Sequence, residues 1–152
     1  MVDIVHRIGI KVPISQVFNA ICSIDGLAHW WTEEVHGDES IGGRIEFTFR
    51  SVNGDVKGKM VMVVEEYQSP VLLRWRCVDG PAEWIGTTIS FELSQQSEQT
   101  IILFGHRNWR EANEMTSHCS MKWAVFLLSL REYLETGKGK PSPNDLKIDN
   151  WN

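Results

Sequence analysis

Residues 119–135 read CSMKWAVFLLSLREYLE, and this stretch decides the fold. Its apolar side chains recur at steps of mainly three and four residues, which places them on one stripe of an α-helix. The members of that stripe are Cys119, Trp123, Phe126, Leu127, Leu130 and Leu134. Val125 and Leu128 widen the apolar face, so the helix must lie against a large apolar surface. The pattern predicts a helix from about Glu111 to Glu135, and Gly137 just beyond it is the type of residue that ends helices.

The chain before this helix alternates between apolar and polar residues in several short runs. Residues 3–12 show the period of a half-buried strand, with His6 as the one polar group on its apolar face. A short helix capped by Ser15, with Pro13 and Ile14 as its entry, is expected to end near Cys22, and a second one is expected over residues 25–31. A polar, glycine-rich passage follows over residues 32–43. Residues 44–50, 56–64, 71–77, 85–93 and 100–106 then predict five strands separated by turn signals. The last of these runs is apolar on both faces, so its pattern leaves the inward face open.

Strands and helices are therefore segregated along the chain, which predicts an α+β fold. Each predicted strand has an apolar face, and one long apolar helix is available to cover them. We expect a curved antiparallel sheet of about six strands wrapped around the C-terminal helix, with two short helices after the first strand. We expect one domain over residues 1–152, of which residues 138–152 form a polar tail that runs extended along the surface.

Composition narrows the classes of protein to consider. The net charge of −5 argues against a nucleic-acid-binding surface and against docking on an anionic membrane. The longest apolar run is far shorter than a membrane span, and the N-terminus shows no secretory signal pattern. The three cysteines are odd in number and widely spaced, as expected for reduced thiols. These features predict a cytoplasmic protein.

Several of these segments together resemble a known family. They are the pair Trp30-Trp31, the stretch FGHRNW over residues 104–109, the helical segment WAVFLLSL over residues 123–130, and the segment ETGKG over residues 135–139. The chain is similar to the START-related helix-grip superfamily, and most of all to the branch named for the C-terminal domain of the activator of the 90-kDa heat-shock chaperone ATPase. The resemblance implies a curved sheet that grips the last helix, with an apolar cavity between them. Superfamily members include lipid carriers, hormone receptors and aromatic cyclases, so the fold alone does not specify a function.

Large apolar side chains on the predicted inner faces, together with two histidines on strands, are candidates to line such a cavity. Tryptophan and methionine suit an adaptable pocket, and a histidine can anchor a polar group of a ligand or move a proton. The predicted ligand-binding residues are His6, Trp30, Trp31, Phe47, Met60, Met62, Trp75, His106, Trp123, Phe126 and Leu127.

Metal binding and nucleophilic catalysis find little support in the sequence. His29 and His36 flank a group of acidic residues, but no pair of potential ligands has the close, repeated spacing of a zinc site. His118 and Cys119 are neighbours on a helix and point about 100° apart, which makes them poor joint ligands. The sequence has no Gly-x-Ser-x-Gly elbow and no phosphate-binding glycine loop. We therefore expect no catalytic residue, no metal and no cofactor.

Three functions stay open at this point. The first is a small cytoplasmic binding module, monomeric or homodimeric, that holds an apolar or aromatic small molecule between the last helix and the sheet. The second is an enzyme of the cyclase or hydratase type, in which His6 or His106 moves protons. The third is a protein-interaction module that modulates a chaperone or another partner. We favour the first, without covalent chemistry.

Overall fold

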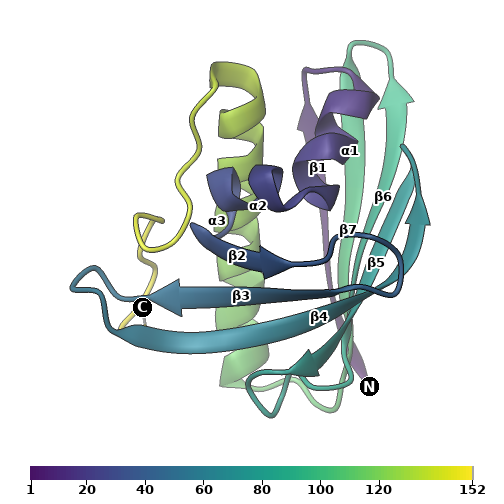
Figure 1. Cartoon of the computed structure of the whole chain (residues 1–152). Helices are drawn as coiled ribbons and strands as arrows, with labels where there is room; N and C mark the ends of the chain where they lie inside the picture. The colour runs from purple at the N-terminus through teal and green to yellow at the C-terminus, as the bar shows by residue number, and fades with distance from the viewer. Residues whose placement is uncertain (152) are drawn as a thin grey trace.

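The computed structural model describes residues 1–151, and within that range it contains one antiparallel sheet and three helices (Figure 1). The strands are β1 (Val2–Ile10), β2 (Glu34–Gly37), β3 (Arg44–Arg50), β4 (Val56–Gln68), β5 (Leu72–Asp79), β6 (Thr88–Gln96) and β7 (Gln99–Trp109). The helices are α1 (Ile14–Cys22), α2 (Ile24–Trp30) and α3 (Glu114–Thr136). The sheet order is β1-β7-β6-β5-β4-β3-β2, and the sheet curves around α3. The predicted α+β helix-grip fold is confirmed.

Among the described residues the sheet has seven strands, where the sequence predicted about six. The additional strand, β2, lies within the polar, glycine-rich passage and pairs with β3, with Val35 opposite Phe47. Val35 is buried while most of its neighbours are polar. With four residues and one buried side chain, β2 is too short to show a period of two, and only its pairing with β3 identifies it.

Side-chain hydrogen bonds at its N-terminus and a glycine at its C-terminus set the length of α3. Asn113 Oδ1 accepts hydrogen bonds from the backbone N–H of Met115 (3.0 Å) and Thr116 (3.2 Å), and Thr116 Oγ1 accepts one from the Asn113 N–H (2.7 Å). This reciprocal cap starts the helix a few residues later than the periodicity suggested. Gly137 ends it with φ of 92°, in the left-handed region that favours glycine.

The inward face of β7, which the sequence left open, carries Ile102, Phe104 and His106, all of them buried. Leu103, on the outward face, is 49% exposed. β7 pairs with β1 on one side and with β6 on the other, so its alternation follows from theirs.

The strand predicted over residues 85–93 is wrong in its first three residues, because β6 starts at Thr88. Residues 81–87 form turns instead, with hydrogen bonds from the Trp84 N–H to Pro81 O and from the Thr87 N–H to Trp84 O, both 2.9 Å. The turns bury Trp84 and leave Ile85 49% exposed. Burying the larger indole ring removes more apolar surface from water.

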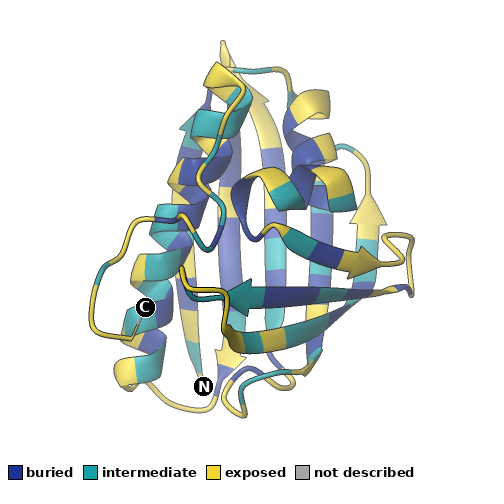
Figure 2. Cartoon of the chain, turned by 60° about the vertical axis from the view of Figure 1, so that its left-hand side comes forward, coloured by how far each residue is buried: buried dark blue, intermediate teal, exposed yellow. Residues whose placement is uncertain are grey.

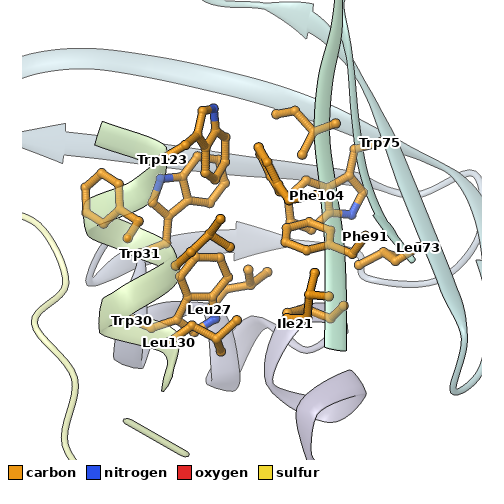
Figure 3. Close-up of a cluster of buried hydrophobic side chains, with 14 of the residues drawn as sticks. Ile21, Leu27, Trp30, Trp31, Leu73, Trp75, Phe91, Phe104, Trp123 and Leu130 are labelled. Atoms are coloured by element: carbon orange, nitrogen blue, oxygen red, sulfur yellow. The ribbon is translucent and has the colours of Figure 1, made fainter. Parts of the chain in front are cut away.

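Aromatic side chains fill most of the space between α3 and the sheet. Figure 3 shows Trp31 from α2's C-terminal cap and Trp123 from α3 facing Phe104 and Trp75 from the sheet. The ring centroids of Phe104 and Trp123 lie 4.5 Å apart, and those of Trp31 and Trp75 lie 6.0 Å apart. The core is therefore packed rather than hollow at this level.

The C-terminal tail has more buried residues and more contacts with the rest of the molecule than the sequence predicted. It runs back beside α3 toward the β3–β4 hairpin, as Figures 1 and 2 show, and Ser142 forms a parallel bridge with Thr32. Ser142 and Asp145 are buried, and Asp145 forms an ion pair with Lys122 of α3. The tail therefore packs against the rest of the molecule, because its buried polar groups have partners on α3 and on the loop after α2. No described helix has both the length and the hydropathy needed to cross a membrane.

Candidate ligand-binding site

A pocket of about 190 Å³ lies between the N-terminal half of α3, the start of β4, the turn before β6 and the C-terminal tail. Its apolar lining consists mainly of Trp31, Phe49, Met60, Trp84, Trp123 and Phe126. Its polar lining consists mainly of Lys57, His118, Lys122, Ser142 and Asp145. The pocket is therefore a concave, mostly apolar site with a few polar groups, which is the usual composition of small-molecule sites.

Ring-to-ring contacts hold the aromatic wall in place. Trp31 packs on Trp123 with the ring centroids 5.0 Å apart, and Trp84 also stacks on Trp123, at 6.3 Å. Phe49 meets Trp31 edge-on at 5.5 Å. Because these rings come from the α2 cap, α3, β3 and a turn, their mutual packing fixes a preformed apolar surface.

A β-bulge places one lysine at this pocket. Phe49 pairs with Gly58 and Arg50 pairs with Val56, so Lys57 is an extra residue between two pairs. Bulges change the direction in which a side chain points, and Lys57 lines the pocket although strict alternation would place it on the outer face with Lys59. A β-carbon added to Gly58 would meet no atom within 4 Å, which agrees with the open space above this part of β4.

The tail side of the pocket is closed by ion pairs. Lys122 Nζ pairs with Asp145 Oδ2, and it also donates to Leu146 O at 3.1 Å. Lys147 Nζ lies 3.2 Å from Asp145 Oδ1. Burial by itself raises the pKa of Asp145, but the two lysines outweigh it and hold that pKa below its usual value. Asp145 is therefore an ionised carboxylate that fastens the tail to α3.

His106 lies beneath the aromatic wall and is completely buried. Its Nδ1 accepts a hydrogen bond from Trp123 Nε1 (3.0 Å), because an indole nitrogen can only donate. The proton of the neutral ring is therefore on Nε2, which donates to Thr87 Oγ1 at 2.8 Å. Burial lowers the pKa of His106 to about 3. The ring is thus neutral at physiological pH, with both nitrogens occupied, and it positions Trp123.

The structure separates the eleven predicted site residues into three groups. Those that line the pocket are Trp31, Met60, Trp123 and Phe126. Those buried in the packed core are Trp30, Phe47, Met62, Trp75, His106 and Leu127. His6 lies elsewhere, between β1 and α3, with its Nε2 3.1 Å from Ser120 O. A binding role for any of the eleven stays a prediction.

Sequence reasoning missed several lining residues. Phe49 shares the inward face of β3 with Phe47, so the same alternation could have indicated it. Trp84 was missed because the sequence pattern predicted a strand from residue 85, whereas residues 81–87 form turns that bury Trp84. Lys57 was hidden by the bulge. Asp145 and Trp151 belong to the C-terminal tail, whose polar composition does not indicate that it lines a pocket.

The described part of the chain shows no arrangement of side chains suited to metal binding or to catalysis by a thiol. Among residues 1–151 no group of three or more His, Cys, Asp or Glu side chains is placed to hold a metal ion. Cys119 lines the pocket, but burial raises the pKa of its thiol to about 11. The thiol is therefore protonated and a poor nucleophile.

Comparison with known protein families identifies the family. The model of the Activator of Hsp90 ATPase homolog 1-like proteins matches residues 11–135, which is most of the chain. This chain belongs to the Aha1-like family. The suspected membership in the START-related helix-grip superfamily is thereby confirmed. A search of curated proteins found no match.

Solved structures agree with this assignment. The Aha1 dimer from Colwellia psychrerythraea is 38% identical, with a TM-score of 0.78, and the match covers 91% of this chain and all of that one. CalU16 from Micromonospora echinospora is 18% identical, with a TM-score of 0.74 and coverage of 97% and 74%. DynU16, from the dynemicin biosynthetic locus, is 17% identical, with a TM-score of 0.71 and coverage of 90% and 48%. The last two share the fold with this chain, and this Aha1-like protein spans about half of DynU16.

Proposed function

We propose that this Aha1-like protein is a small binding module that holds an apolar or aromatic small molecule in the pocket between α3, β4 and the tail. The observation that supports it is the preformed wall of Trp31, Trp84 and Trp123, next to an open volume of about 190 Å³. An apolar cavity of about 150 Å³ accepts benzene, so this space suits one or two rings rather than a whole fatty chain. CalU16 and DynU16 share only the fold with this chain, so they do not specify a ligand for it.

The state of His106 argues against the cyclase or hydratase alternative. A histidine that catalyses proton transfer needs a pKa near the working pH and a free nitrogen that faces the substrate. Burial holds the pKa of His106 near 3, and Trp123 and Thr87 occupy both of its ring nitrogens. His6, the other histidine of that alternative, lies away from the pocket, with its Nε2 3.1 Å from Ser120 O. We therefore favour binding without catalysis.

The test of the binding function is a titration of the full chain with naphthalene-2-carboxamide, a neutral aromatic probe. Tryptophan fluorescence should change on binding, and the melting temperature should rise with probe concentration by mass action. The Gly58→Leu variant should abolish both signals while keeping its stability, because the new side chain enters open space. Lys59→Leu, on the outer side of the same strand, is the matched control and should bind like the wild type. Equal binding by Gly58→Leu would reject the pocket as the site.

A second function, association with a protein partner or with a second copy, is favoured by a different surface. Met121 and Leu128 on the outer side of α3 are 56% and 48% exposed, and Leu146 of the tail beside them is 67% exposed. The 38% identical relative is described as a dimer. Light scattering at several protein concentrations tests this function. A dimer that Leu128→Lys converts to a monomer would support it, and a monomer at all concentrations would speak against self-association.

We further propose that the protein works in the cytoplasm, as a monomer or homodimer, without nucleic acid or membrane as a partner. The support is the net charge of −5 and the three cysteines, all of them buried and free rather than in disulfides. Fractionation of cells expressing the full chain tests the location.

A further inference from the structure

Charges at the pocket are distributed differently from those of the whole chain. Of the described residues at and next to the tail side of the pocket, Lys57, Lys122 and Lys147 are cationic, whereas Asp145 and Asp149 are anionic. The Asp149 carboxylate also pairs with His118, at 2.7 Å from its Nδ1. Three lysines against two carboxylates leave a local positive excess in a chain whose net charge is −5. The site therefore favours an anion over a cation.

One of the three lysines supplies this excess. Lys122 and Lys147 both pair with Asp145 and also donate to backbone carbonyls of the tail. Lys57 makes no ion pair and no hydrogen bond with any residue between 1 and 151. Burial lowers its pKa, and repulsion by Lys147 and Lys122 adds to that effect against the weaker pull of Asp145 and Asp149. An anion beside Lys57 would offset both the burial of its ammonium group and the repulsion by the two other lysines.

The position of Lys57 matches the pocket. The bulge in β4 makes it a lining residue, next to Gly58 and Met60, so its ammonium group is available where the apolar wall reaches the surface. Asp145, on the tail, lines the same pocket and would repel a second negative charge. One available cation with a fixed carboxylate nearby suits a monoanion better than a dianion such as a phosphate.

We propose that the pocket selects an aromatic carboxylic acid, with its ring against Trp31 and Trp123 and its carboxylate beside the Lys57 ammonium. This inference rests on the proposed binding function and adds the charge of the ligand to it. A carboxylate that meets an ammonium at a partly dry pocket edge forms a charge-assisted hydrogen bond, whereas a neutral amide of the same shape does not. Lys57 would thus determine which aromatic molecules the site prefers.

The experiment compares naphthalene-2-carboxylate with naphthalene-2-carboxamide by isothermal titration calorimetry on the full chain at pH 7. The carboxylate should bind about tenfold more tightly, as expected for one charge-assisted hydrogen bond. Lys57→Gln should reduce this preference to about twofold or less, mainly by weakening the binding of the carboxylate. Lys59→Gln, which removes a lysine paired with Glu46 on the outer face, should retain the preference. Raising the salt concentration should weaken it.

The outcomes separate this inference from the binding function itself. Equal affinities for acid and amide in the wild type, or a preference that survives Lys57→Gln, would overturn the role of Lys57 and leave the binding function standing. If neither compound binds at millimolar concentration, both proposals fail. Binding of both compounds that Gly58→Leu abolishes, together with a preference that only Lys57→Gln removes, would support both.

Discussion

His106 links the last strand to the pocket wall through two hydrogen bonds. Trp123 donates to one ring nitrogen and Thr87 accepts from the other, and Thr87 Oγ1 in turn donates to Trp84 O at 2.6 Å. The chain of bonds runs between two of the tryptophans that line the pocket. A single buried histidine therefore fixes the relative positions of α3 and the turn before β6.

The burial of His106 predicts a specific pH dependence of stability. Its folded pKa of about 3 lies below the ordinary 6.5, so on acidification the unfolded chain takes up the proton first. The stability due to the neutral ring is complete above about pH 6.5 and is lost as the pH falls toward 3, at up to about 1.4 kcal/mol per pH unit. In urea unfolding between pH 7 and 4, the stability advantage of wild type over His106→Gln should shrink steadily. Parallel pH curves for the two proteins would contradict this account.

The ion pair between Lys122 and Asp145 is a second test at the residue scale. Their side chains are 12% and 4% exposed, so removing one partner leaves a poorly solvated charge. Asp145→Ala should cost about 2–4 kcal/mol, whereas the double variant Lys122→Met/Asp145→Ala should cost less because no unpaired charge remains at α3. Urea unfolding of the single variant and of the double variant measures the two losses in the free energy of unfolding. A double variant that is less stable than Asp145→Ala would show that the pair is not acting through charge.

At the scale of elements, α3 presents two different faces to its surroundings. Leu127 and Leu130 are 2% and 0% exposed and pack into the core, while Leu128 between them is 48% exposed. Leu127→Ala and Leu130→Ala should each cost about 2–5 kcal/mol. Leu128→Ala, the matched control on the same helix, should cost less than about 1 kcal/mol. Thermal or urea unfolding tests the order, and similar losses at all three positions would contradict the observed orientation of α3.

At the scale of the whole molecule, we expect the tail to contribute to stability although its described residues, 138–151, form no helix or strand. Deleting residues 141–152 would remove the partners of Lys122 and one wall of the pocket. A loss of roughly 2–3 kcal/mol corresponds to a melting temperature lower by about 5–10 °C for a chain of this size. Far-UV circular dichroism should hardly change, and acrylamide should quench tryptophan fluorescence more strongly because Trp31 and Trp123 become accessible. An unchanged melting temperature would mean that the tail only rests on the surface.

The sequence by itself determined the fold class, because local periodicity records which face of an element is buried. The stripe from Cys119 to Leu134 required a large apolar partner, and the period of two in the middle of the chain supplied a sheet for it. β2 was missed because four residues with one buried side chain do not make a period. The number of aromatic residues does not show whether their side chains fill the space between α3 and the sheet or leave a cavity there. The answer depends on how rings from four elements pack against one another.

Only the tertiary structure decided where the pocket lies. The β-bulge in β4 turns Lys57 toward the pocket. The alternation of apolar and polar residues in one strand cannot reveal a change of register with its partner strand. The turn that buries Trp84 replaced the expected start of a strand. The tail became a wall through contacts between residues far apart in sequence, such as Thr32 with Ser142 and Lys122 with Asp145. Such contacts depend on the completed fold, because their energy is gained only after the sheet and α3 have brought the partners together.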